Sequence, residues 1–227
     1  MRIIFVRHGE PDYDKDCLTD NGICQAKATA IRLKDENIKA VFASPMGRAM
    51  QTASFTASEH GLSVEELPFM HEINWGGEML PYDGHPWTLA YDLICESPES
   101  LKGDNWREHP YFKDNICMDY YDRISAESDI FLQRFGLKRE GDIYRCSDNK
   151  EDAIVIFAHG GSGAVFISHL LNLPFPYVLT AMPYGVCSVS IFDMAPLGTD
   201  LVIPKVEIFN DMGHLGEVRK EKLRFEK

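Results

Sequence analysis

The chain has 227 residues, of which 44% are hydrophobic and 26% charged, as is usual for a folded globular protein. Its formal net charge of −12 argues against nucleic acid or an anionic membrane surface as the main partner. No apolar stretch approaches the ~20 residues that a membrane span requires, so we expect a protein that does not cross a membrane.

Buried strands and amphipathic helices alternate along the first third of the sequence. The strands are short apolar runs that end at polar residues, and the helices carry apolar residues at helical spacing. Thr19 is expected to cap the first helix. Ser44 and Pro45 are expected to begin the second helix, which Gly61 closes. The expected elements are, in order, a strand at 2–7, a helix at 19–38, a strand at 39–44, a helix at 44–61 and a looser strand at 62–70.

The stretch from about 79 to 150 is rich in Gly, Pro, Asp and aromatic residues and has no strong β run. We interpret it as a lid-like, irregular and helical insertion in a single domain that spans residues 1–227. Within it, apolar residues on one face predict a helix over 121–137, and 87–96 is a weaker helical candidate. Regular structure is expected to return with a strand at 153–158, a helix that Pro174 must end, and strands at 186–194 and 201–210.

The alternation of helices with strands that are apolar throughout predicts an α/β fold around a mostly parallel sheet. In such sheets the ligand binds in the crevice beyond the carboxyl ends of the strands. Two of the expected strands end alike there, as "FVRHG" and "IFAHGG", and each places a histidine directly after its apolar run. If these strands are neighbours, His8 and His159 lie at the same edge of the sheet.

Two arginines accompany these histidines. Arg7 adjoins His8, and Arg48 lies among small residues near the start of the helix after the second strand. The forked guanidinium group of arginine matches the oxygens of a phosphate. Gly160, which begins a helix, can offer the phosphate a backbone N–H. A neutral histidine can attack phosphorus to form a phosphohistidine that water later opens. Cations beside it would neutralise charge on the phosphoryl oxygens.

This chemistry also needs an acid, because the departing alkoxide must take up a proton. Glu72 in "LPFMHEINWGG" is the best candidate, since it follows the third strand and enters a glycine-rich loop. Glu10, Asp12 and Asp14 are rivals because they lie close to His8 in the sequence. We expect Glu72 to be the proton donor, with another carboxylate as the alternative.

Five segments occur in a telling order: "VRHGE", "LTDNGICQA", "ASPMGRAMQTA", "HEINWG" and "FAHGGSG". With them the chain resembles the histidine phosphatase superfamily, also called phosphoglycerate mutase-like. The segment "FNDMGHLGE" is similar to one found late in many members of that family. The match spans both ends of the chain and is weak only across about 79–150.

The resemblance implies a three-layer α/β/α sandwich that requires no metal or other cofactor. It also implies a role for each matching residue. His8 would be the phosphorylated nucleophile, Arg7, Arg48 and His159 the rest of the phosphate pocket, and Glu72 the proton donor. The expected partner is a small-molecule phosphomonoester, and the sequence leaves the oligomeric state open.

Two departures from the family pattern bear on function. Only "PDYDKDC" separates the RHGE motif from the Leu-Thr motif, so a loop that often contacts substrate is short. The basic residues with which glycolytic mutases hold a bisphosphate are not evident. We therefore favour a phosphatase for a small organic phosphate, with specificity set by the insertion. A phosphoglycerate-type mutase and a catalytically inactive phospho-ligand-binding or scaffold protein are the alternatives.

The six cysteines are scattered without a C-x-x-C pair, and no HxH or HxxxH spacing suggests a metal site. The N-terminal apolar run ends at Arg7 and is too short for the core of a secretory signal. We therefore expect a cytoplasmic protein with reduced thiols.

Overall fold

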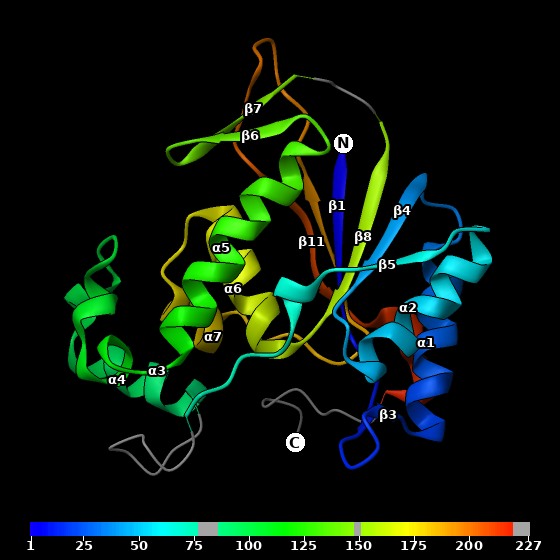
Figure 1. Ribbon diagram of the computed structural model, residues 1–227, viewed down its shortest axis with the longest axis horizontal. Coiled ribbons are helices and arrows are strands. Elements are labelled where there is room, and N and C mark those ends of the chain that lie inside the picture. The colour runs from blue at the N-terminus through cyan, green and yellow to red at the C-terminus, as the bar shows by residue number, and fades with distance from the viewer. Residues whose placement is uncertain (77–85, 148–150, 220–227) are drawn as a thin grey trace.

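The computed structural model describes residues 1–76, 86–147 and 151–219. Its centre is a six-stranded sheet in the order β11-β9-β1-β8-β4-β5 (Figure 1). In chain order these strands are β1 (Arg2–Arg7), β4 (Ile38–Ala43), β5 (Val64–Glu66), β8 (Ala153–Ala158), β9 (Val189–Asp193) and β11 (Lys205–Asp211). β1, β8, β4 and β5 run parallel to one another. β9 pairs antiparallel with β1, and the edge strand β11 pairs antiparallel with β9. The predicted α/β fold with a mostly parallel sheet is confirmed.

Helices cover both faces of this sheet and complete three layers (Figure 1). They are α1 (Asp20–Leu33) and α2 (Gly47–Glu59) on one face, and α5 (Cys117–Gln133), α6 (Gly160–Leu171) and α7 (Phe175–Ala181) on the other. Successive side chains of a strand point to opposite faces, so β1 contributes to both cores. Ile4 packs with Leu33 of α1, whereas Phe5 belongs to the cluster that contains Phe166 of α6. Among the described residues, no helix combines the length and apolar character needed to cross a membrane.

The described part of the expected insertion is mainly helical. It contains α3 (Pro86–Glu96), α4 (Pro110–Lys113), α5 and a hairpin of β6 (Leu137–Glu140) and β7 (Ile143–Cys146). A third strand, β10 (Leu201–Val202), pairs with β7. Buried side chains of this segment, such as Trp106 and Ile124, join the same hydrophobic cluster as Phe5 of the central sheet. Residues 79–85 and 148–150 of the expected insertion lie outside the described residues.

Two helix boundaries differ from those predicted at Ser44 and Pro174. Ser44 does not cap α2, because the helix begins at Gly47 and Met46 occupies the N-cap position, while the Ser44 hydroxyl lies 2.7 Å from His159 Nε2. Asp16 takes the capping place instead, and its Oδ2 accepts the Gly47 N–H at 2.6 Å. Helix α6 already ends before Asn172, which adopts a left-handed conformation, so Pro174 precedes α7 instead of ending α6.

Two predicted strands differ from the structure, and one hairpin was not predicted. The strand expected at 201–210 is divided into β10 and β11, because Pro204 between them has no N–H to donate to a ladder. The β6–β7 hairpin was not predicted, because charged residues such as Arg139 and Arg145 interrupt its apolar pattern. The looser strand expected at 62–70 is shorter than predicted and lies at the sheet edge as β5.

Candidate active site

His8 and His159 lie against each other at the carboxyl ends of β1 and β8. The two strands are direct parallel neighbours, with Arg7 in register with Ala158. The His8 backbone N–H donates to the Ala158 carbonyl at 2.9 Å, which extends the pairing by one residue. The two imidazole centroids are 5.1 Å apart, and both rings are almost completely buried. The structure thus brings together two histidines that are far apart in the sequence.

The His8 ring is held in one orientation by contacts at both of its nitrogens. Nδ1 lies 2.7 Å from the Gly9 carbonyl, which can only accept, so Nδ1 carries the proton. Nε2 therefore keeps a lone pair, toward which the Arg48 Nε–H donates at 3.3 Å. Burial lowers the pKa of His8 to about 3, and the positive charges of Arg7 and Arg48 act in the same direction. The ring is consequently neutral near pH 7.

His159 lies behind His8 and is equally well shielded from solvent. Its Nε2 contacts the Ser44 hydroxyl at 2.7 Å, while its Nδ1 is buried without a hydrogen-bond partner among the described residues. Burial, followed by the nearby His8, lowers the pKa of His159. Both imidazoles are therefore neutral near pH 7, and of the two only His8 is among the described residues that line the cavity.

Arg48 is fixed by a short loop between β2 (Pro11–Asp12) and β3 (Cys17–Leu18). Asp16 in this loop binds Arg48 Nη1 through Oδ1 at 2.5 Å while its Oδ2 caps α2, and its own φ of +48° is one that Asp tolerates. A Cβ on Gly47 would lie 2.2 Å from the Asp16 carbonyl, so only glycine lets the loop approach the helix. The exposed Tyr13 ring lies over the guanidinium at 5.4 Å.

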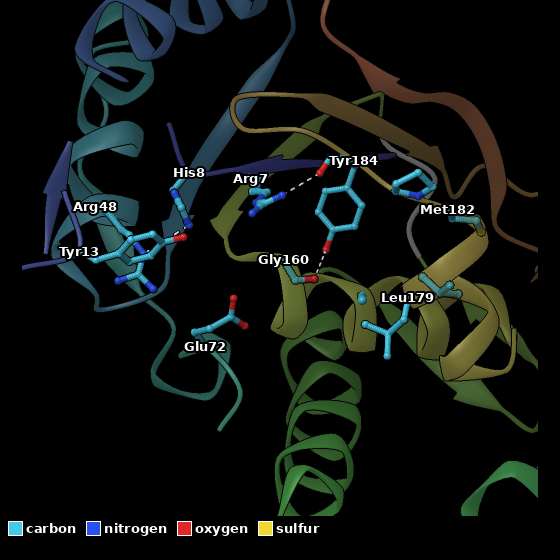
Figure 2. Close-up of a pocket in the computed structure, with 12 residues that line it drawn as sticks. Arg7, His8, Tyr13, Arg48, Glu72, Gly160, Leu179, Met182 and Tyr184 are labelled. Atoms are coloured by element: carbon cyan, nitrogen blue, oxygen red, sulfur yellow. Dashed lines mark hydrogen bonds between the residues drawn. The ribbon is translucent and has the colours of Figure 1, made fainter. Parts of the chain in front are cut away.

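Arg7 lies at the end of β1, on the other side of His8 (Figure 2). Its Nη1 donates to the Tyr184 carbonyl at 2.9 Å, which anchors the guanidinium. Its Nε is buried and has no hydrogen-bond partner among the described residues. A buried donor without a partner is costly.

The Glu72 carboxylate is directed into the space between the two arginines (Figure 2). It is held at the start of α6, where Oε1 accepts the Ser162 N–H at 2.9 Å and Oε2 accepts the Gly161 N–H at 3.2 Å. Its Oε1 also accepts the Ile73 N–H at 2.9 Å. A Cβ on Gly161 would lie 2.7 Å from Oε1, so glycine is needed for this close approach. Backbone N–H groups at a helix N-terminus thus orient the carboxylate.

Two rival carboxylates are engaged elsewhere. Glu10 accepts from the Thr19 hydroxyl at 2.9 Å and from the Asn21 amide at 2.8 Å, which ties it to the beginning of α1. Thr19 itself caps α1, as predicted, by accepting the Gly22 N–H at 3.0 Å. Asp12 pairs with Lys15 at 3.0 Å within the β2–β3 loop. Of the described carboxylates, Glu72 is the one that lines the cavity beside His8.

These side chains surround a cavity of about 400 Å³. One part of its lining is polar, and Figure 2 shows the charged groups gathered on one side. The polar part consists of Arg7, His8, Tyr13, Arg48, Glu72 and Gly160. The other part consists of Ala164, Val178, Leu179, Met182, Pro183 and Tyr184. Within the described ranges, no group of three or more His, Cys, Asp or Glu side chains is arranged to hold a metal ion.

The charged residues that line the cavity are predictable from the sequence. The residues that hold those side chains in place, and those on the opposite wall, are not. Asp16 and Tyr13 of the β2–β3 loop contact Arg48. Ser44, which the sequence predicts to be a helix cap, contacts His159. Met182 and Tyr184 enter from the segment after α7, which carries no motif. Among the described residues of the expected insertion, none lines the cavity.

The site thus combines a mostly parallel sheet with a cavity that is lined by one histidine, two arginines and a carboxylate, and a second buried histidine packs against the first. Such a cavity is suited to an anion. A model of the histidine phosphatase superfamily (branch 1) matches residues 3–107, which include Arg7, His8, Arg48 and Glu72. By this match the chain is similar to the histidine phosphatase superfamily over its first half.

Individual relatives are phosphatases and mutases by name. The adenosylcobalamin/alpha-ribazole phosphatase of Escherichia coli is 26% identical over 186 residues, which cover 77% of this chain and 81% of that protein. A probable phosphoglycerate mutase of Yersinia pestis is 32% identical over 85 residues, which cover 34% of this chain and only 40% of the mutase. The crystal structure of a phosphoserine phosphatase from Entamoeba histolytica superposes with a TM-score of 0.63 at 23% identity, covering 94% of this chain and 98% of that one. At this identity the structural likeness establishes the fold.

Proposed function

We propose that this protein is a phosphomonoester hydrolase that acts through a phosphohistidine at His8. The observation that carries the proposal is the state of the His8 ring. Its Nδ1 proton is committed to the Gly9 carbonyl, so Nε2 carries the lone pair, which accepts the Arg48 Nε–H until a phosphoryl group takes that donor. A low pKa keeps this nitrogen unprotonated near pH 7, as a nucleophile requires.

In the proposed first step, the Nε2 lone pair attacks phosphorus as the bond to the ester oxygen breaks. Arg7 and Arg48 flank His8 and would neutralise the phosphoryl oxygens, and Gly160 lies at the same cavity wall. His159 would form a hydrogen bond to the phosphoryl group from the buried side of the site, since its Nδ1 lacks a partner among the described residues. These cations are local, because the whole chain carries a formal charge of −12.

Glu72 is the proposed proton donor to the leaving oxygen. Its carboxyl group projects into the cavity across from His8 and is oriented by the backbone at the start of α6 (Figure 2). After the alcohol leaves, the resulting carboxylate would take a proton from water as that water attacks phosphorus. The products are inorganic phosphate and free His8, and Glu72 regains its proton.

The test uses His8→Ala and the matched variant His60→Ala. His60 lies at the end of α2, where its Nε2 is 3.1 Å from the Leu33 carbonyl, and it does not line the cavity. Each protein is incubated with phenyl phosphate, quenched with alkali and examined by mass spectrometry for phosphohistidine. We expect a phosphoryl group on His8 and turnover of phenyl phosphate in the wild type and in His60→Ala. We expect neither in His8→Ala.

Undiminished turnover by His8→Ala would refute the proposal. A third outcome separates the reaction classes, because a probable mutase is among the relatives. If the phosphoenzyme passes its phosphoryl group to a monophosphoglycerate faster than to water, the protein is a mutase and not a hydrolase.

A further inference from the structure

The cavity has two ends of different chemistry. The end at the sheet edge presents His8 with the guanidinium groups of Arg7 and Arg48. The opposite end is formed by α7 and the segment after it, where Leu179, Met182 and Tyr184 face the same space (Figure 2). A phosphate group bound at the first end therefore directs its ester substituent toward the second.

The wall at the second end offers hydrocarbon in place of polar groups. The Tyr184 hydroxyl donates to the Gly160 carbonyl at 2.6 Å and lies 3.2 Å from the His159 carbonyl, so this group is already engaged. Its ring packs edge-on against Phe5 at 5.8 Å, which fixes the face that lines the cavity. What remains for a ligand is the ring itself and the side chains of Met182 and Leu179.

The charges of the lining disfavour a second anionic group on the ligand. Of the described lining residues, the cations are Arg7 and Arg48, both beside His8, and the remaining charged group is the Glu72 carboxylate. A carboxylate or second phosphate on the substrate would lie against hydrocarbon, without a cation from the described lining to offset its desolvation.

We propose that the leaving group of the substrate is uncharged and largely apolar, such as a small aryl or alkyl alcohol. This inference rests on the proposed phosphatase function and adds the class of ester to it. A cavity of about 400 Å³ favours a compact alcohol. Residues 178–184, which follow the last glycine-rich motif, are then the determinants of specificity.

The experiment compares phenyl phosphate with 4-carboxyphenyl phosphate, which differ by one carboxylate at the far end of the ring. We expect the wild type to hydrolyse phenyl phosphate with a kcat/KM about tenfold higher. The variant Met182→Lys places a cation on the wall and is expected to narrow this ratio several-fold, mainly by improving kcat/KM for the carboxylated ester. The matched control is Tyr177→Lys, because Tyr177 lies in α7 just before Met182, is 41% exposed and does not line the cavity. It should keep the wild-type ratio.

Equal hydrolysis of the two esters by the wild type, or a preference for the carboxylated one, would overturn the inference and leave the phosphatase proposal standing. A ratio that moves equally in Met182→Lys and Tyr177→Lys would also overturn it, since the wall would then not be the cause. If neither ester is hydrolysed and no phosphohistidine forms, the proposed function itself fails. These results are therefore distinguishable.

Discussion

The two buried imidazoles predict a specific loss of stability in acid. In the folded protein the pKa of His8 is about 3, whereas the ordinary value of 6.5 applies once the chain unfolds. Between these values the unfolded state binds one proton more than the folded state, so the free energy of unfolding falls as pH falls. Each pH unit below 6.5 costs about 1.4 kcal/mol, and a change from pH 6.5 to 5.0 costs about 2 kcal/mol for His8 alone. His159 shifts in the same direction and adds to the loss.

The perturbation is His8→Asn, because the Asn amide can replace Nδ1–H as a donor to the Gly9 carbonyl and does not titrate. Urea unfolding at pH 7.5, 6.5, 5.5 and 5.0 gives the free energy of unfolding of each protein. Relative to pH 7.5, the variant should lose about 2 kcal/mol less than the wild type at pH 5.0. Parallel curves for the two proteins would show that His8 is not buried in its neutral form, and the argument for its nucleophilicity near pH 7 would lose its basis.

Two further variants test the groups around His8. Asp16→Asn keeps an acceptor for the Gly47 N–H but removes the charge paired with Arg48. We expect kcat/KM, measured by steady-state kinetics, to fall about tenfold and the melting temperature to change little. If Asp16 were purely structural, the substitution would lower the melting temperature instead. Glu72→Gln should reduce turnover of alkyl phosphates about a hundredfold and of aryl phosphates only a few-fold, because only a basic alkoxide needs the proton. The control Glu10→Gln should affect both ester classes alike, and equal losses for Glu72→Gln would reassign the acid.

The central sheet could be predicted because its strands carry their own signal. β1 and β8 are continuous apolar runs that end in the same way, and this pattern is local to each strand. The hairpin of β6 and β7 could not be predicted, because its partly buried arginines take part in ion pairs that form only in the folded chain. Arg139 pairs with Asp129 of α5, and Arg145 pairs with Glu140 across the turn. Tertiary partners thus supply what the apolar pattern lacks.

The charged residues of the site were predictable for a related reason. Arg7 and His8 follow directly from a strand end, and Arg48 from the start of a helix, so local position and residue type suffice. Ser44 was misread because a serine before a helix is a common cap, whereas its hydroxyl contacts His159. Tyr184 could not be predicted, because it reaches the cavity through a connection between α7 and β9 that has no periodic pattern.

The short loop between β2 and β3 helps to fix the charged end of the cavity, whereas the apolar end depends on other residues. Because the loop is short, Asp16 adopts a positive φ and binds both the start of α2 and Arg48. The charged end of the cavity is therefore held by β1, β8, α2 and α6 together, and each of these elements carries a motif that can be recognised in the sequence. The apolar end depends on residues 178–184, which contact the charged end through the carbonyl and hydroxyl of Tyr184. Substitutions at Met182 or Leu179 can consequently change which alcohol fits without displacing the groups proposed to act on phosphorus.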